Sequence, residues 1–239
     1  MMKIDALILA GGLGTRMGGN ISKQFIEING VPIIVKTIQN FENNKRVSEI
    51  AIVCVDNFKD SLWELVKKYN LKKVKYIISG GKTGHDSSRN GVFYLERILK
   101  EEDFVIIHDA VRPILPQTIL DEMIDVALLR GNACLAVPCY ETVVCTTDGI
   151  SGNKEIDRNS FVRVQTPQMY NYKLLLDLYK KAEKDDIHDF IYANTMAIHY
   201  GTTIYFSKGF NFNYKITTPD DLPLYKALLN FSEEELSRR

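Results

Sequence analysis

The sequence lacks any excess of charge of either sign. Its 239 residues include 30 basic and 30 acidic side chains, which gives a formal net charge of +0 with histidine neutral. A chain of this kind has no overall field that would concentrate a nucleic acid or an anionic membrane at its surface. We therefore expect no nucleic-acid partner, and any polyanion must be bound at a local site.

Long apolar runs are absent as well. No run approaches the roughly 18 residues that a membrane span needs, and Asp5 stands where a signal peptide would continue its apolar segment. These absences predict a cytoplasmic protein without a membrane partner. The cysteines form no C-x-x-C pair and stand in apolar, strand-like stretches, which predicts buried, reduced thiols rather than metal ligands or a nucleophile. They are Cys54, Cys134, Cys139 and Cys145.

What the sequence does contain is a regular alternation of apolar strands and amphipathic helices. The expected strands cover 6–10, 49–55, 74–79, 103–110 and 133–138, and the expected helices cover 32–41, 58–70, 86–100 and a stretch in which Leu120, Met123, Ile124 and Ala127 share one face. Continuous apolar strands separated by helices predict a mostly parallel, Rossmann-like α/β sheet with helices on both faces. Such sheets bind ligands at the carboxyl ends of their strands.

The alternation is interrupted between about 139 and 165. There "ETVVCTT" and "SFVRVQ" are typical of two antiparallel strands, joined through the glycine-rich turn "DGISGN". We interpret this as an excursion from one domain that covers 1–239, and the hairpin could cover its own sheet or embrace a partner subunit. Helices near 171–183 and 189–200, a strand at 202–207 and a closing helix that begins within 217–222 complete the chain.

The stretch "ILAGGLGTRMGGNISKQF", residues 8–25, leads from an apolar strand into a glycine-rich loop with two cations. Glycines let backbone N–H groups approach an anion. The loop is not a Walker loop, because no lysine follows Gly14, and it is not a dinucleotide fingerprint, because Met17 occupies the third glycine position. Arg16 and Lys23 could converge on one polyphosphate; the alternative is a glycine turn with two solvated cations.

Four further stretches, taken with this loop, resemble the cytidylyltransferases that make CDP-activated polyol phosphates, namely the methylerythritol-phosphate and ribitol-5-phosphate cytidylyltransferases. The resemblance spans roughly 5–225 and implies a fold of the nucleotide-diphospho-sugar transferase type with a protruding β-arm. It also implies a homodimer formed through that arm and a Mg²⁺-dependent transfer from CTP. The stretches are "GGKTGHDSSRNGV" (80–92), "IIHDAVRP" (106–113), "VRVQTPQMY" (162–170) and "NYKITTPDDL" (213–222).

The resemblance assigns catalytic roles to three cations. Arg16 and Lys23 would cover the triphosphate, and Lys215 would approach the α-phosphate, although Lys215 could also be a solvated cation at a strand edge. The cytosine would be recognised mainly by main-chain groups, in a pocket too small for a purine. The implied nucleotide-binding residues are Ala10, Gly11, Gly12, Gly14, Gly80, Gly81, Lys82 and Ser87.

On the acceptor side, the resemblance points to Asp109 and Arg112, just past the strand "FVIIH". A carboxylate beside phosphates is repulsive unless a cation is shared, so Asp109 would hold the Mg²⁺; alternatively, Asp109 caps the next segment or pairs with Arg112. The implied substrate-binding residues are Asp109, Arg112, Glu141, Thr142, Arg158 and Thr166.

The expected chemistry needs no nucleophilic triad. A phosphate monoester is mostly dianionic at neutral pH, since its second pKa is about 6. It can therefore attack the α-phosphorus of CTP without a general base, and the transition state needs positive charge around that phosphate. This agrees with the histidines, which form no obvious nucleophile pair; they are His85, His108, His188 and His199.

Two departures from the family pattern concern the acceptor. The methylerythritol enzymes typically read Asp-Thr-hydrophobic-Lys where this chain reads "ETVV", and the missing lysine favours ribitol 5-phosphate, with 2-C-methyl-D-erythritol 4-phosphate as the alternative. In "HDFIYANTM", either His188 and Asp189 or Ile191 and Tyr192 replace the family's Thr-Asp or Ser-Asp pair.

Two rival classes are a nicotinamide-dependent reductase and an inactive nucleotide-binding module. The missing third glycine counts against the first, and the set of cations expected around the α-phosphate counts against the second.

Overall fold

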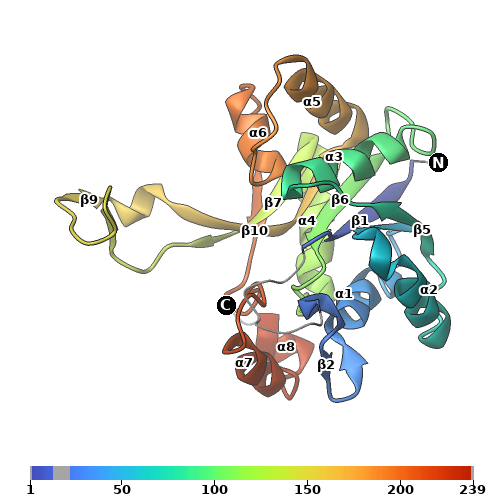
Figure 1. Cartoon of the computed structure of the whole chain (residues 1–239). Coiled ribbons are helices and arrows are strands. Elements are labelled where there is room, and N and C mark those ends of the chain that lie inside the picture. Colours follow the sequence, from blue (N-terminus) through green and yellow to red (C-terminus); the bar gives the residue numbers. More distant parts are fainter. Residues whose placement is uncertain (1, 13–21, 238–239) are drawn as a thin grey trace.

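The centre of the molecule is a seven-stranded sheet in the order β11-β7-β10-β6-β1-β4-β5 (Figure 1). The computed structural model describes residues 2–12 and 22–237. Strand β10 is antiparallel to both of its neighbours, and the other pairs of the sheet are parallel. The strands are β1 (Ile4–Ala10), β4 (Ile50–Cys54), β5 (Val74–Ser79), β6 (Phe104–Asp109), β7 (Asn132–Pro138), β10 (Val162–Asn171) and β11 (Phe206–Lys208). The predicted mostly parallel sheet is confirmed.

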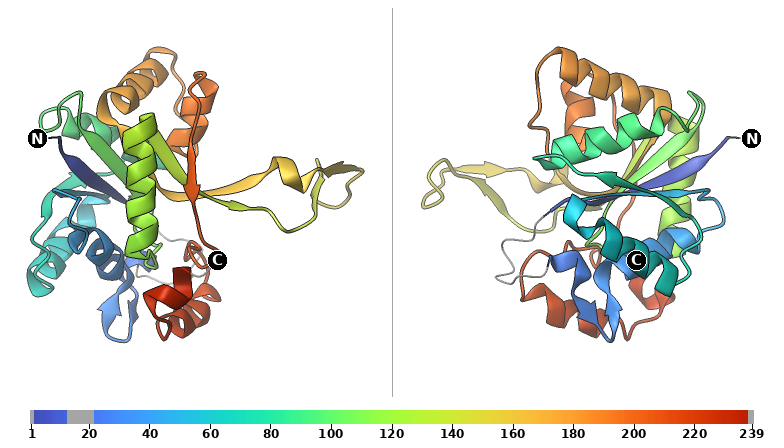
Figure 2. Two further views of the ribbon diagram at one scale, coloured as in Figure 1. Left: turned by 180° about the vertical axis from the view of Figure 1, so that it is seen from behind. Right: turned by 45° about the vertical axis from the view of Figure 1, so that its right-hand side comes forward.

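Helices cover both faces of this sheet, so the chain has two hydrophobic cores (Figure 2). One core lies beneath α1 (Ile33–Glu42), α2 (Lys59–Lys68), α4 (Gln117–Arg130), α7 (Asp221–Leu228) and α8 (Glu233–Ser237). The other lies beneath α3 (Gly84–Leu95), α5 (Tyr172–Lys184) and α6 (Ala193–His199). In β1, Ala6 and Ile8 belong to the first core and Leu7 to the second, because successive side chains of a strand point to opposite faces.

The β-arm leaves the sheet after β7 and returns through β10, and it projects away from the body in every view (Figures 1 and 2). The prediction of its pairing was wrong. Strand β8 (Val143–Cys145) pairs with β9 (Lys154–Ile156), whereas the segment "SFVRVQ" enters β10 and pairs with β7. Alternation along a strand identifies its two faces but does not select its partner.

Two helices begin at other residues than predicted, because hydrogen-bonded caps set their N-terminal ends. Helix α3 begins two residues before its predicted start, because the Thr83 hydroxyl accepts a hydrogen bond from Asp86 N while the Asp86 carboxylate accepts one from Thr83 N. Helix α6 begins at Ala193 rather than 189, where the Thr195 hydroxyl bonds to the main chain of Tyr192. The predicted strand at 202–207 is reduced to β11.

The cysteines divide between the body and the arm. Cys54 and Cys134 are buried in β4 and β7, as predicted, and all four thiols are free. Cys139 is half-buried and Cys145 is exposed, which contradicts the prediction for these two, because the arm has no helical layer to cover it. Among the described residues, no helix is long and apolar enough to cross a membrane.

The remaining regular segments are small. Strands β2 (Glu27–Ile28) and β3 (Val31–Pro32) form a separate two-stranded ribbon, and short 3₁₀ turns cover Lys23–Phe25, Asp56–Phe58 and Arg158–Ser160. The first of these turns brings the Gln24 amide against Ala10 O at the end of β1.

Candidate active site

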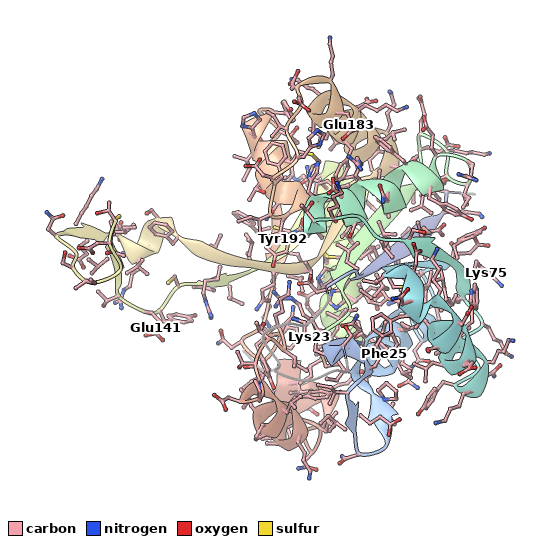
Figure 3. The ribbon with its side chains drawn as sticks, in the orientation of Figure 1. Lys23, Phe25, Lys75, Glu141, Glu183 and Tyr192 are labelled. Carbon is pink, nitrogen blue, oxygen red and sulfur yellow. The ribbon has the colours of Figure 1, made fainter. Side chains whose placement is uncertain are left out.

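A cavity of about 620 Å³ opens at the carboxyl ends of β1, β4, β5 and β6, where ligands bind in open parallel sheets. The structure brings ten of the predicted residues to its wall. They are Ala10, Gly11, Gly12, Lys23, Gly81, Lys82, Ser87, Asp109, Thr166 and Lys215. Figure 3 labels Lys23 and Tyr192, which also line this cavity and come from opposite halves of the chain.

One wall of the cavity is a tight main-chain loop between β5 and α3. The buried Ser87 hydroxyl accepts a hydrogen bond from Gly81 N at 3.0 Å and donates to Thr83 O at 2.9 Å. A Cβ on Gly11 would lie 2.7 Å from Ser87 Oγ, and a Cβ on Gly81 would lie 2.1 Å from the Asp86 Cβ. The glycines are therefore required by close packing, which brings the main chain of this loop to the cavity wall.

Gly80 belongs to the same loop but is not part of the cavity lining. Its N–H donates to Cys54 O at 2.8 Å. Gly80 supports the cavity wall instead of facing a ligand.

The second wall contains the cation that follows the glycine-rich loop. Lys23 lines the cavity and is 9% exposed. The buried Gln24 amide beside it donates to Ala10 O at 3.0 Å and to Gly12 O at 3.3 Å, which ties this turn to the end of β1. The predicted residues Gly14 and Arg16 lie outside the described residues.

The third wall is charged. Asp109 Oδ1 accepts a hydrogen bond from Lys215 Nζ at 3.1 Å, and Asp109 Oδ2 accepts one from Arg112 Nε at 2.9 Å. Burial acts to raise the pKa of Asp109, but the charges of Lys215 and Arg112 outweigh it and hold the pKa below its ordinary value. The Thr166 hydroxyl bonds to Asp109 N at 3.2 Å. Asp109 is therefore an ionised carboxylate between two cations.

Arg112 lies behind Asp109 and does not line the cavity. Its Nη1 donates to Asn213 O at 2.7 Å, and its side chain is buried. Asp109 does pair with Arg112, and Arg112 reaches the cavity only through this carboxylate. The role of Asp109 toward Mg²⁺ stays a prediction.

Three predicted acceptor residues lie on the arm and do not join the cavity of their own chain. They are Glu141, Thr142 and Arg158. Figure 3 shows Glu141 out along the arm, away from Lys23 and Tyr192. The exposed Arg158 side chain donates to Tyr140 O at 3.1 Å, within the arm.

The structure decides between the two alternatives for the segment before α6. Ile191 and Tyr192 line the cavity, and the Tyr192 ring lies 5.7 Å from Lys215 Nζ. His188 and Asp189 do not; His188 contacts Asp186 at 3.0 Å and Glu183 at 3.2 Å. The unshifted alignment is the one that meets the cavity.

Two lining glutamines were missed. Gln24 and Gln168 stand in the motifs "SKQF" and "QTPQMY", next to residues that the prediction did select. Gln168 Oε1 accepts hydrogen bonds from Asn194 N and Tyr170 OH, which orients the amide in the wall. Their position inside these two motifs is the sequence feature that could have identified them as site residues.

The described cavity wall contains few side chains that could ligate a metal ion. Within the described residues, no group of three or more metal-ligating side chains converges, and Asp109 is the one carboxylate in the described lining. Mg²⁺ is commonly held by one or two carboxylates together with substrate phosphates. A single ionised aspartate would suffice as the protein ligand of a Mg²⁺ bound in this way.

Comparison with known proteins agrees with this geometry. The model of the family IspD: 2-C-methyl-D-erythritol 4-phosphate cytidylyltransferase matches residues 4–231. A ribitol-5-phosphate cytidylyltransferase from Lacticaseibacillus paracasei is 39% identical over 232 residues, which cover 96% of this chain and 99% of the relative. A 2-C-methyl-D-erythritol 4-phosphate cytidylyltransferase from Clostridium novyi is 36% identical over 239 residues, which cover 96% and 97%.

Solved structures agree as well. The crystal structure of the Francisella tularensis 2-C-methyl-D-erythritol 4-phosphate cytidylyltransferase has a TM-score of 0.80 and 25% identity over 94% of this chain and 99% of its own. The sequence, the sheet and the cavity lead to one conclusion: the chain belongs to the IspD family of cytidylyltransferases.

Proposed function

We propose that the protein transfers a cytidylyl group from CTP to a polyol phosphate and releases pyrophosphate, with ribitol 5-phosphate as the preferred acceptor. One observation carries the proposal. A single cavity is lined by a loop of main-chain groups around Ser87 and by the cations Lys23 and Lys215 beside the ionised Asp109. This is the arrangement that a pyrimidine base and a reacting phosphate chain require.

In the proposed reaction, a phosphate oxygen of the acceptor forms a bond to the α-phosphorus of CTP as the bond from that phosphorus to the β-phosphate bridging oxygen breaks. The electron pair leaves with pyrophosphate. The attacking phosphate is already dianionic, so no side chain has to remove a proton. Lys23 and Lys215 supply positive charge, which stabilises a transition state with negative charge spread over the phosphoryl oxygens.

The state of Lys215 is favourable for this role. Its ammonium is held by Asp109 and by the face of Tyr192, so it is oriented before a substrate arrives. Pre-orientation reduces the cost of arranging charge at the moment of reaction.

Mg²⁺ dependence is part of the proposal. Asp109 would contribute the protein ligand, and the ion would add positive charge to that of the lysines in the cavity wall. Removal of divalent ions with EDTA is expected to abolish pyrophosphate release, and added Mg²⁺ is expected to restore it.

The choice of ribitol 5-phosphate depends on the relatives and on the arm. The relative from L. paracasei carries that substrate in its name, and the arm segment "ETVV" lacks the lysine typical of the methylerythritol enzymes. The relative from C. novyi is nearly as similar, so 2-C-methyl-D-erythritol 4-phosphate is the second candidate.

A homodimer would explain the arm. Arg158 cannot serve the cavity of its own chain from its place on the arm, and the arm exposes Tyr140, Val144, Ile150 and Phe161 to solvent. Exposed apolar groups along an extended ribbon favour contact with a second copy. We propose that each arm brings its Arg158 to the acceptor phosphate at the partner's cavity, in a cytoplasmic dimer.

The test is pyrophosphate release from CTP and Mg²⁺ with ribitol 5-phosphate, 2-C-methyl-D-erythritol 4-phosphate and glycerol 3-phosphate supplied separately. We expect the highest kcat/KM with ribitol 5-phosphate. A preparation of Lys215→Ala, purified in parallel, measures any contaminating host enzyme.

Each outcome is informative. Turnover only with 2-C-methyl-D-erythritol 4-phosphate would transfer the proposal to the second acceptor and would show that the missing lysine is no specificity marker. Failure to release pyrophosphate with any acceptor, by a folded protein that binds CTP, would leave an inactive nucleotide-binding module.

A further inference from the structure

Gln165 occupies the point where the arm joins the body. It lies in β10, and Val162, Arg163 and Val164 before it are exposed, whereas Gln165 is 8% exposed. Its amide faces the segment 209–213, which leads from β11 toward Lys215. A buried amide must find hydrogen-bond partners, and those partners reveal what it holds in place.

Both ends of the Gln165 amide, Nε2 and Oε1, form hydrogen bonds. Nε2 donates to Phe210 O at 3.0 Å, and Oε1 accepts from Phe210 N and from Asn213 Nδ2, each at 3.4 Å. Gly209 makes room for it, since a Cβ there would lie 2.7 Å from Gln165 Oε1 and 2.9 Å from Ala136 O. The side chain therefore acts as a clamp between β10 and the segment that follows β11.

The clamp continues through Asn213 to the charged wall. Asn213 Nδ2 donates to Thr166 O at 2.8 Å, and Asn213 O accepts from Arg112 Nη1 at 2.7 Å. Beyond Lys215, Ile216 N donates to Val111 O at 3.0 Å. The main chain at Lys215 is thus fixed on both sides, and its Nζ meets Asp109 from a defined position.

We propose that Gln165 is a positioning residue for the reaction: it fixes the segment that carries Lys215 and so sets where the ammonium stands relative to the α-phosphate. The inference rests on the proposed function, because it assigns Lys215 to the transition state. Gln165 does not line the cavity, so its influence passes through Asn213 and the main chain.

The test replaces Gln165 with Met, which keeps the length of the side chain and removes its hydrogen bonds. Misplacing a catalytic group costs rate, and we expect kcat to fall about tenfold while KM for CTP changes less than about twofold. Gln117→Met is the matched control. Gln117 donates to Asn40 O at 2.9 Å and accepts from Asn44, but it lies at the start of α4 and does not line the cavity.

A double-mutant cycle separates positioning from stability. If Gln165 acts through Lys215, the Gln165→Met change costs about tenfold in the native background and almost nothing in a Lys215→Ala background. Equal losses in both backgrounds would overturn the inference. If Gln165→Met does not fold, Asn213→Ala serves instead, because it removes the Nδ2 donor to Gln165 Oε1 and Thr166 O and leaves Gln165 in place.

A second measurement does not depend on turnover. Trace acetylation followed by mass spectrometry gives the reactivity of Lys215, which we expect to rise about threefold or more in Gln165→Met as the ammonium leaves Asp109. An unchanged reactivity would also overturn the inference. If the native enzyme is inactive with every acceptor, the proposed function fails, and the labelling then decides separately whether Gln165 fixes the position of Lys215.

Discussion

Asp5 allows a quantitative prediction about pH and stability. This carboxyl is 1% exposed at the start of β1; Oδ1 accepts from Glu49 N at 3.2 Å, and Oδ2 has no hydrogen-bond partner among the described residues. Burial, and after it repulsion from Glu49 and Asp103, raises the pKa of Asp5 to about 6. The charge of Lys3 and the hydrogen bond from Glu49 N act in the opposite direction. The ionised form is therefore the unfavourable one in the folded chain.

The sign and size of the pH dependence of stability follow from the difference between the folded and unfolded pKa of Asp5. Because the folded pKa lies above the unfolded value of 3.8, stability is lost as the pH rises through this interval. The whole cost is about 3 kcal/mol, and about 1.4 kcal/mol of it appears between pH 5 and pH 8. Asp5→Asn can still accept from Glu49 N but cannot ionise, so its advantage over the native chain should grow by that amount.

Chemical denaturation at the two pH values measures the difference. Asp60→Asn on α2 is the control, because it removes an exposed carboxyl and changes the net charge equally. A gap between Asp5→Asn and the native chain that stays constant from pH 5 to pH 8 would refute the reasoning, since a lost hydrogen bond or a packing defect does not titrate.

Three further predictions concern the cavity. Lys215→Ala should lower kcat about a hundredfold or more with a smaller effect on CTP affinity, and near-native turnover would remove Lys215 from the mechanism. Arg158→Ala should raise KM for the acceptor more than it alters CTP binding; loss of CTP affinity alone would assign this arginine to the other substrate. Gly81→Ala should weaken CTP binding about tenfold, because its methyl would collide with Asp86; an unchanged CTP affinity would contradict the packing argument.

The sheet was predictable because its strands are continuous apolar runs. Runs such as "FVIIHDA" admit few alternatives to a strand buried on both faces, and the glycine-rich loop at the end of β1 pointed to the ligand edge. Pairing within the arm was not predictable, since β8 and β9 are short and both faces of the ribbon meet solvent.

The site was predictable to the extent that motifs carry it. Lys23, Ser87 and Lys215 meet at one cavity as the resemblance implied. The supporting amides of Gln24 and Gln165 were not foreseen, because a glutamine has no fixed chemical role until its partners are known.

The arm has a genetic consequence. If its Arg158 serves the neighbouring cavity, two variants that are both impaired at low acceptor concentration can repair one another: a chain with Lys215→Ala still lends an intact arm, and a chain with Arg158→Ala still has an intact cavity. Random assortment of equal amounts makes half of the dimers mixed, each with one complete site, so about a quarter of the native activity should return on mixing. Defective alleles of this gene would then complement one another in a single cell.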